Sequence, residues 1–268
     1  SGCGKTTLLR LIAGFERPSS GHLLIDNKPM DGVEPNLRPT NMVFQNYALF
    51  PHMSVAENLS FPLEVRKMGK ADREAKILRA LDMVEMGSFA GRRPAQLSGG
   101  QQQRIALARA LVFEPELVLM DEPLGALDKR LREQTQFELM DIQEKLEVTF
   151  VIVTHDQEEA LSIADRIFVM NDGEMIQAGS PRDVYINPAD PFVANFIGMT
   201  NFVDGKVVGA SSIDVAGKRI AVQCKGLSKG DQIRVAARPE AIEICPKGTK
   251  TSLSTNLLVG ASRINCPI

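Results

Sequence analysis

The 268-residue sequence lacks several features that would place it among secreted, membrane-spanning or nucleic-acid-binding proteins. It has only four cysteines and no C-x-x-C pair, so reduced thiols are expected rather than a disulfide framework. No apolar run approaches the roughly 20 residues that span a bilayer, so a transport role would require another chain to form the pore. The formal net charge of −2 excludes the strongly basic character typical of nucleic-acid-binding domains.

What the sequence does have is enough apolar material, 44% of its residues, to build one large core or two smaller ones. Within it, residues 97–101 (LSGGQ) predict the capped start of a helix. Ser98 and Gln101 have the S-x-x-Q spacing of a capping box, and apolar residues recur at helical spacing through residues 101–113. Such a start exposes backbone N–H groups and the positive end of the helix dipole, and so can bind an anion. By itself the segment is equally an ordinary loop-to-helix connection.

The chain opens with the second half of the phosphate-binding pattern G-x-x-x-x-G-K-[ST]. The residues concerned are Ser1, Gly2, Cys3, Gly4, Lys5, Thr6 and Thr7. Small residues let the backbone N–H groups wrap phosphate oxygens, Lys5 adds a positive charge, and the Thr6 hydroxyl suits Mg²⁺. Taken alone, these residues are also typical of a flexible glycine-rich terminus. The apolar residues at positions 8, 9, 11 and 12 predict a buried helix that Gly14 ends.

Three apolar runs predict buried strands, and each is followed by polar side chains. These are Gln45 after residues 40–44, Asp121 and Glu122 after residues 117–120, and His155 after residues 149–153. Because open parallel sheets bind ligands at the carboxyl ends of their strands, His155 is expected beside the phosphate site. Asp121 is suited to holding Mg²⁺ through water, and Glu122 to polarising the attacking water. Each of these residues, considered singly, is also typical of a polar strand end or turn.

The order and spacing of these motifs resemble the ATP-binding cassette (ABC) ATPases, over residues 1–155. Residues 124–128 (LGALD) resemble the family's D-loop, although Gly125 stands where the family usually has serine. The resemblance implies an α/β fold of the P-loop NTPase type, with a mostly parallel sheet and a helical subdomain over about residues 46–100. It also implies that the family's first strands, with an aromatic residue that stacks on adenine, are missing, so the given chain is expected to fold and bind nucleotide poorly.

The resemblance also implies roles for particular residues, with ATP and Mg²⁺ as the cofactors. The catalytic residues would be Glu122 as general base, His155 at the γ-phosphate and Gln45 at Mg²⁺ and the attacking water. The metal-binding residues would be Thr6, Gln45 and Asp121. The nucleotide-binding residues would be those at positions 1–7 together with Ser98, Gly99, Gly100, Gln101 and Asp128. In this family two ATPases pair head to tail, and each LSGGQ segment covers the ATP held by the other subunit.

The domains expected are an ATPase domain over residues 1–198 and a β-rich domain over residues 199–268. Short β-like runs separated by Gly, Asp and Lys turns occupy the second part, at residues 202–208, 213–215, 220–223, 233–237 and 242–245. They resemble the oligonucleotide-barrel-like (TOBE-like) regulatory domain of ABC importers, as does the Arg238-Pro239-Glu240 sequence. A generic β appendage is the alternative. The family normally continues beyond this chain's end, so a truncated C-terminus is expected as well.

The resemblance implies that the protein is the ATPase subunit of an ABC importer. Its sequence most resembles the ATPases of polyamine (spermidine/putrescine) importers. Its expected partners are a second ATPase in the ATP-bound state, a transmembrane permease and, indirectly, a substrate-binding protein, at the cytoplasmic face of the inner membrane. Sugars, ferric iron and phosphonates are alternative solutes. Near Gln45, a set of apolar residues could line a groove for a partner helix or equally form local core: Tyr47, Leu49, Phe50 and Met53.

Other classes of ABC protein fit the sequence less well. A soluble ABC ATPase acting on nucleic acid or ribosomes would be expected to show a long coiled coil, a second cassette or a basic tail, and none is present. No nucleic-acid partner is therefore expected. Exporters usually lack a β-rich tail, and a non-catalytic regulator would be expected to lack Glu122 or His155.

Overall fold

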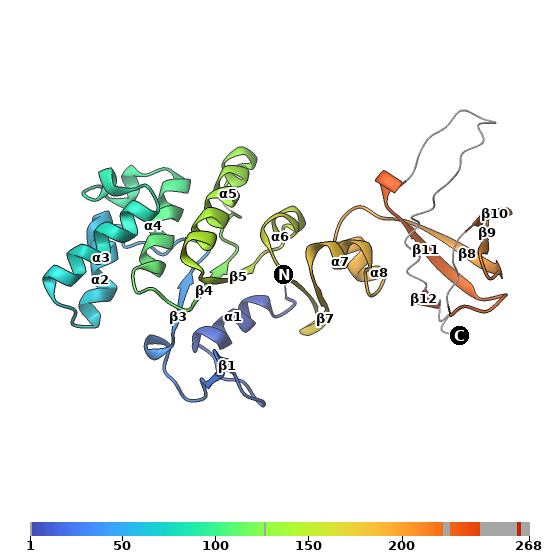
Figure 1. Cartoon of the computed structure of the whole chain (residues 1–268), viewed down its shortest axis with the longest axis horizontal. Coiled ribbons are helices and arrows are strands. Elements are labelled where there is room, and N and C mark those ends of the chain that lie inside the picture. Colours follow the sequence, from blue (N-terminus) through green and yellow to red (C-terminus); the bar gives the residue numbers. More distant parts are fainter. Residues whose placement is uncertain (1, 126, 222–225, 242–261, 264–268) are drawn as a thin grey trace. The chain divides into compact units, whose positions relative to one another are not determined.

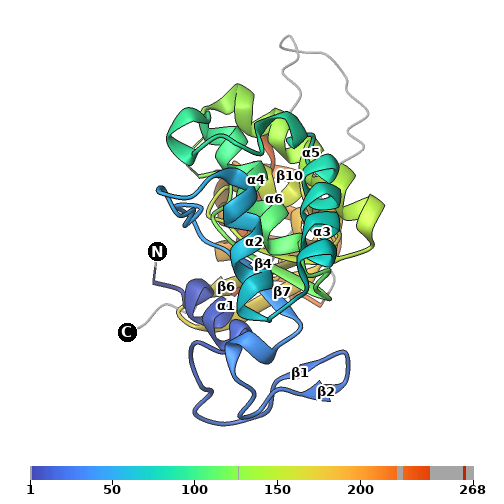
Figure 2. The same cartoon turned by 90° about the vertical axis from the view of Figure 1, so that its left-hand side faces the viewer.

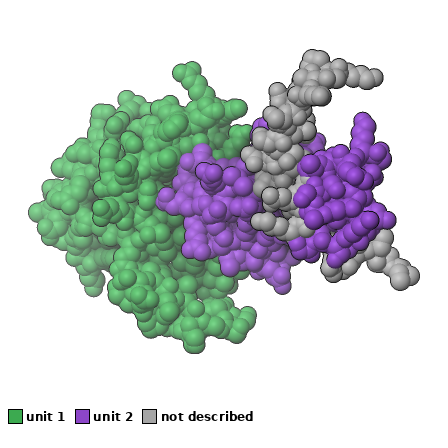
Figure 3. Space-filling view, turned by 45° about the vertical axis from the view of Figure 1, so that its right-hand side comes forward, with its two compact units in different colours: residues 1–159 green, residues 160–268 purple. Residues whose placement is uncertain are grey.

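The computed structural model describes residues 2–125, 127–221, 226–241, 262 and 263 (Figure 1). The chain divides into two compact units, residues 1–159 and 160–268, which Figure 3 colours separately. The boundary expected at residues 198 and 199 falls within the second unit and stays a prediction. None of the helices in the described ranges is long and apolar enough to cross a bilayer.

The first unit is built around a parallel sheet, as the three apolar runs predict. Its strands are β3 (Thr40–Val43), β4 (Leu117–Asp121) and β5 (Thr149–Val153), in the order β3-β4-β5. Their nearly continuous apolar sequences suit strands that are covered on their faces. Because the strands are parallel, the residues that follow them emerge at one edge of the sheet.

Helix α1 (Lys5–Ala13) packs against this sheet through Leu9 and Ala13, which contact the core of β4 and β5. Gly14 ends the helix in the left-handed conformation (φ 88°), as predicted, and its N–H bonds to carbonyls of the last turn. The prediction that the whole apolar run is buried is wrong at Leu8, whose side chain is 41% exposed. Leu8 and Leu9 are adjacent on a helix and so cannot both face the sheet.

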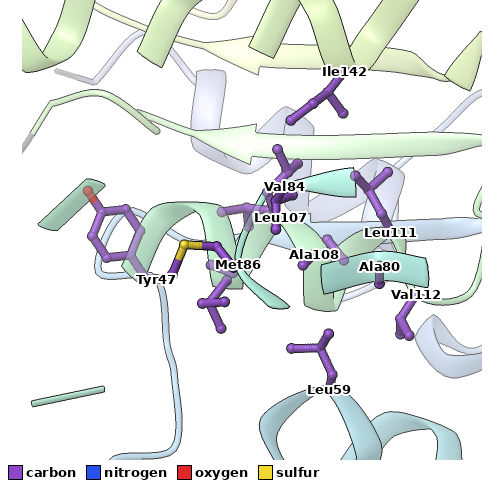
Figure 4. Packing of buried hydrophobic residues seen from close by; sticks show 14 of the residues in the cluster. Tyr47, Leu59, Ala80, Val84, Met86, Leu107, Ala108, Leu111, Val112 and Ile142 are labelled. Atoms are coloured by element: carbon purple, nitrogen blue, oxygen red, sulfur yellow. The ribbon is translucent and has the colours of Figure 1, made fainter. Parts of the chain in front are cut away.

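A helical region follows the first strand of the sheet. It contains α2 (Val55–Val65), α3 (Lys70–Met83) and α4 (Gly99–Leu111), with short 3₁₀ turns at Gly87–Phe89 and Pro94–Gln96. Figures 1 and 2 show these helices together on one side of the unit. Their facing sides form the largest buried cluster (Figure 4), which includes Leu59, Leu81 and Leu107. The helical spacing of apolar residues predicts a helix over residues 70–86, but α3 ends three residues earlier, at Met83. Glu85 then follows in the left-handed conformation (φ 57°).

The remaining elements of the first unit connect these parts. A small hairpin joins β1 (Leu24–Ile25) to β2 (Lys28–Pro29), and a 3₁₀ turn follows at Pro35–Leu37. The sequence predicts a long, heavily charged helix over residues 129–146, and α5 occupies Lys129–Leu146. Asp128 caps its start, and Glu147 ends it in the left-handed conformation (φ 53°). Helix α6 (Gln157–Ile163) begins directly after the residues that follow β5.

The second unit contains the predicted hairpin of β6 (Ile167–Asn171) and β7 (Glu174–Gly179), followed by α7 (Pro181–Ile186) and α8 (Pro191–Phe196). Asp172 and Gly173 form its turn with positive φ angles, as the Asn-Asp-Gly sequence predicts. An antiparallel sheet then follows, in the order β10-β9-β8-β11-β12. Its strands are β8 (Asn201–Gly209), β9 (Ser212–Val215), β10 (Lys218–Ala221), β11 (Gln232–Ala237) and β12 (Ser262–Arg263), with a 3₁₀ turn at Pro239–Ala241.

The expected barrel is not shown by this sheet. Within the described ranges, its two outer strands, β10 and β12, pair on one side only, so the strand order is open. The predicted run at residues 242–245 and the end of the run at residues 220–223 lie outside the described residues. The strands themselves are confirmed where they are described, and the TOBE-like assignment remains a proposal.

Candidate functional site

The first part of the site is the start of α1. Gly2 (φ 109°) and Gly4 (φ 82°) adopt left-handed backbone conformations that strain any residue with a Cβ atom. Gly4 stands at the N-cap, so Lys5 is the first helical residue and no side chain caps the N–H groups of the first turn. Such a glycine-led helix start is suited to binding phosphate oxygens. Ser1, also predicted to bind nucleotide, lies outside the described residues.

Two predicted Mg²⁺-binding side chains meet beside this helix start. The Thr6 hydroxyl donates a hydrogen bond to Asp121 Oδ1 at 3.2 Å, which joins α1 to the end of β4. A hydroxyl and a carboxylate oxygen are the hard oxygen ligands that Mg²⁺ prefers. No group of three or more His, Cys, Asp or Glu side chains in the described part of the chain could hold a metal. The Thr6 and Asp121 oxygens fit Mg²⁺, which usually binds few protein oxygens and completes its coordination with water and substrate phosphates.

Glu122 is held at both carboxylate oxygens by side chains from neighbouring strand ends. Gln45 Nε2 donates to Oε2 at 2.9 Å, and His155 Nδ1 lies 3.1 Å from Oε1. Glu122 itself has φ 48°, a left-handed conformation that is uncommon for a side-chain-bearing residue and that concentrates at functional sites. Its N–H bonds to the Val153 carbonyl at 2.8 Å, which continues the pairing of β4 with β5. The structure thus brings together the three residues predicted to be catalytic.

The LSGGQ segment forms the predicted capping box. Ser98 Oγ accepts a hydrogen bond from the Gln101 N–H at 3.3 Å, and Gln101 Oε1 accepts one from the Ser98 N–H at 2.9 Å. α4 begins at Gly99, two residues earlier than predicted. A Cβ atom on Gly100 would lie 3.2 Å from the Leu131 side chain of α5. No hydrogen bond or ion pair among the described residues joins this segment to residues 2–7 of the same chain.

Asp128 caps α5, because its Oδ1 accepts a hydrogen bond from the Leu131 N–H at 3.0 Å. This structural role was not predicted from the sequence, where the family resemblance placed Asp128 among the nucleotide-binding residues. The cap fixes the end of the segment that begins at Glu122. Ala126 within that segment lies outside the described residues.

The sequence did not identify Arg132 as part of the site. Its Nη1 donates to Asp156 Oδ2 at 2.6 Å and its Nη2 to the Leu127 carbonyl at 3.1 Å. With Glu122, His155 and Glu159, it lines a small hollow between the segments that follow β4 and β5. Glu159 is 2% exposed, and burial raises its pKa above the ordinary value. One arginine in a heavily charged helix gives no sequence signal that distinguishes it from its neighbours.

Of the apolar residues after Gln45, which could line a groove or form local core, Tyr47 belongs to the core. Its ring is 6% exposed and belongs to the main core, beside Met86 in Figure 4. Phe50 is half-buried and its ring meets that of Phe61 edge-on, with ring centroids 4.9 Å apart. Leu49 packs against the same core as Tyr47. These residues thus contribute to local packing, and the structure holds no partner helix that would test the groove.

This geometry is that of a P-loop cassette, in which the glycine-led start of α1 and the side chains that follow β3, β4 and β5 lie at the carboxyl edge of a parallel sheet. Residues 1–125 match the family model described as ABC transporter. A similar solved structure is CbiO1 from Clostridium perfringens, described as part of the ABC transporter complex CbiONQ. It is 33% identical in sequence, the match covers 69% of this chain and 75% of that chain, and the TM-score is 0.64. The chain belongs to the ABC transporter ATPases, a family that hydrolyses ATP with Mg²⁺.

Proposed function

We propose that this ATPase subunit serves an ABC import system and couples ATP binding and hydrolysis to solute uptake through a separate membrane permease. The observation that carries the catalytic part is the Glu122 carboxylate, which Gln45 and His155 hold in place. A general base must be fixed relative to the water that it activates, and contacts to both oxygens provide this. Glu122 then accepts a proton from the attacking water. The water oxygen bonds to the γ-phosphorus while the bond from that phosphorus to the β–γ bridging oxygen breaks, and ADP leaves with the electron pair.

The other proposed roles follow from where the side chains lie. Lys5 and the N–H groups at the start of α1 bind and orient the phosphates of ATP, which places the γ-phosphoryl group. Thr6 and Asp121 hold Mg²⁺, with Gln45 able to reach the same region because it bonds to Glu122. The cation, when bound, neutralises charge on the phosphate oxygens. His155, beside Glu122, contacts the γ-phosphate in this scheme.

The LSGGQ segment is proposed to act on the ATP of a second subunit. In support, α4 presents an exposed, serine-capped N-terminus that is suited to an anion, yet no bond among the described residues ties it to the same chain's phosphate loop. Ser98, Gly99, Gly100 and Gln101 would close over the partner's nucleotide, and Asp128 would lie near the same interface. The permease and, indirectly, a substrate-binding protein complete the assembly at the cytoplasmic face of the inner membrane.

Polyamine is the solute that we propose. The support is that the sequence as a whole resembles polyamine importers most. Residues 46–52 resemble ABC importers in general, and the β-rich segment with Arg238-Pro239-Glu240 resembles the TOBE-like domain of sugar, polyamine and iron importers. Reconstitution with a spermidine permease should give ATP-dependent uptake of labelled spermidine. Uptake of a sugar, ferric iron or a phosphonate by a matching permease, without spermidine uptake, would reassign the solute and leave the ATPase role intact.

Replacement of Glu122 by Gln tests the catalytic role. The amide keeps the size and the hydrogen-bonding geometry but cannot accept the proton, so kcat should fall by roughly 10²–10⁴-fold. ATP affinity, measured by equilibrium binding, should stay close to that of the unchanged protein because the phosphate loop is intact. A Glu122→Gln protein that hydrolyses ATP at an undiminished rate would remove Glu122 from the role of base.

Replacement of Ser98 by Arg tests the paired arrangement. The longer charged side chain should block closure over the partner's nucleotide, while far-ultraviolet circular dichroism and ATP binding by the single subunit stay unchanged. Light scattering on the Glu122→Gln background, with and without ATP, measures the pairing. ATP-driven dimers that persist after Ser98→Arg would contradict the arrangement.

A further inference from the structure

The loop between β3 and α2 has a strained backbone directly after Gln45. Tyr47 (φ 61°) and Ala48 (φ 47°) both adopt the left-handed conformation, although neither is glycine. This conformation is unfavourable for any residue with a Cβ atom, so two such residues in succession persist only where the surroundings hold them.

Arg109, from the last turn of α4, contacts both residues. Its Nη1 donates to the Ala48 carbonyl at 2.8 Å and its Nη2 to the Tyr47 carbonyl at 3.0 Å. The guanidinium carbon also lies 5.7 Å from the centroid of the Phe50 ring. Burial lowers the pKa of Arg109, and no ion pair with an acidic side chain is present within the described residues. Removing a charged guanidinium from water is unfavourable when no carboxylate pairs with it. Its hydrogen bonds to the two backbone carbonyls offset this cost, which favours a specific role in positioning them.

The rest of the loop is anchored independently. The Tyr47 ring is buried in the main core (Figure 4). Asn58 of α2, fully buried, accepts from the Phe50 N–H at 2.8 Å and donates to the Phe50 carbonyl at 3.2 Å. The segment that carries Gln45 is therefore fixed after Tyr47. The N–H groups of Tyr47 and Ala48 make backbone hydrogen bonds within the turn, and Arg109 holds the carbonyls of the same two residues.

Arg109 belongs to the same helix as the LSGGQ segment. α4 begins at Gly99 and is rigidly tied to the sheet, because Asn41 Nδ2 of β3 donates to the Ala110 carbonyl at 2.5 Å. We propose that Arg109 is a positioning residue for ATP hydrolysis, which holds the loop so that Gln45 reaches Glu122 and which links α4 to that loop. The inference rests on the proposed roles of Glu122 and Gln45.

The test compares Arg109→Met with Arg104→Met in the full chain. Arg104 lies on the same helix and pairs with Glu138 of α5, so it controls for the loss of an arginine from α4. Arg109→Met should lower kcat by roughly 10- to 100-fold, the loss that follows from misplacing a catalytic group. The KM for ATP should change little, and Arg104→Met should leave kcat nearly unchanged.

A double-mutant cycle with Gln45→Ala distinguishes positioning from general destabilisation. If Arg109 acts through Gln45, Arg109→Met should have little further effect on kcat once Gln45 is alanine, whereas effects of independent residues multiply. Arg104→Met should combine independently with Gln45→Ala. Equal losses from Arg109→Met with and without Gln45 would overturn the proposal.

Arg109→Lys covers the case in which the methionine variant does not fold. A lysine can donate to only one of the two carbonyls at a time, so kcat should lie between that of the unchanged protein and that of Arg109→Met. The Tyr47 and Phe50 amides should exchange with solvent faster than in the unchanged protein. An unchanged kcat together with unchanged exchange would overturn the proposal.

Glu122→Gln in the same assay separates the proposed catalytic role of Glu122 from the positioning role of Arg109. If Glu122→Gln still hydrolyses ATP, the proposed role of Glu122 fails. If Glu122→Gln is inactive but Arg109→Met has an undiminished kcat, only the inference about Arg109 is refuted.

Discussion

At the scale of single residues, Glu159 shows what folding does to a carboxyl group. It is 2% exposed and accepts a hydrogen bond from the Thr154 hydroxyl. Burial is the largest effect on its pKa and raises it above the ordinary 4.5, and the neighbouring Asp156 acts in the same direction. The folded state therefore binds the proton more tightly than the unfolded chain does. The free energy of unfolding consequently decreases as pH rises from 4.5 through the folded-state pKa.

Glu159→Gln should remove this pH dependence, because an amide has no proton to lose. Urea denaturation at about pH 5 and about pH 8 should show a smaller loss of stability at the higher pH than in the unchanged protein. Glu158→Gln, at an exposed position on the same helix, is the control and should leave the difference as it was. A Glu159→Gln protein with the original pH dependence would show that another group is responsible.

At the scale of elements, the segments after β4 and β5 are joined through the first turns of α5. Arg132 donates both to Leu127, in the segment after β4, and to Asp156, in the segment after β5. Both partners of the Arg132–Asp156 pair are mostly buried, with side-chain exposures of 30% and 26%. Since Asp156 follows His155 directly, this pair fixes the position of the chain beside the proposed catalytic residues.

Arg132→Ala should lower the free energy of unfolding by about 1–3 kcal/mol, because it removes two hydrogen bonds and leaves Asp156 without its ion pair. Urea denaturation of the purified variant measures the loss. The matched control is Lys145→Ala on the same helix, whose ion pair with Asp141 is exposed and should contribute only about 0–1 kcal/mol. Equal losses in the two variants would show that the Arg132 contacts are no stronger than a surface pair.

At the scale of the whole molecule, each unit has its own core, and Arg238 organises that of the second unit. It is 5% exposed and donates to the Ala194 carbonyl at 2.9 Å, the Thr200 hydroxyl at 2.6 Å and the Tyr185 carbonyl at 3.2 Å. Its guanidinium also lies 4.2 Å from the centroid of the Tyr185 ring. The acceptors come from α7, α8 and the approach to β8, so one side chain ties the short helices to the sheet.

Arg238→Met should loosen the second unit without loosening the first. Loss of the donors leaves buried carbonyls unsatisfied at a cost of about 1–3 kcal/mol. Native-state hydrogen exchange should therefore become faster in β8 and β11 and stay unchanged in β3, β4 and β5. The control is Arg234→Met in β11, the strand that ends just before Arg238, which removes an exposed ion pair with Asp204 of β8. Uniformly faster exchange in both units would contradict the local role of Arg238.

Much of this protein follows from local sequence. The strands before Gln45, Glu122 and His155, the helix at residues 129–146 and the capping box at Ser98 all lie where short-range pattern predicts them. Periodicity and capping depend on neighbouring residues, and parallel pairing then brings the three strand ends to one edge. The family was indicated separately, by the resemblance of the motifs to those of ABC ATPases, and the comparisons support it.

Only the tertiary structure decided which arginines matter and how the sheet of the second unit is ordered. Arg109 and Arg132 resemble other charged helical residues in sequence, and their importance comes from carbonyls and carboxylates that the fold brings to them. The same is true of Leu8, which belongs to an apolar run but lies on the exposed side of α1. Contacts of this kind depend on segments distant in the chain, so no pattern within one segment can specify them.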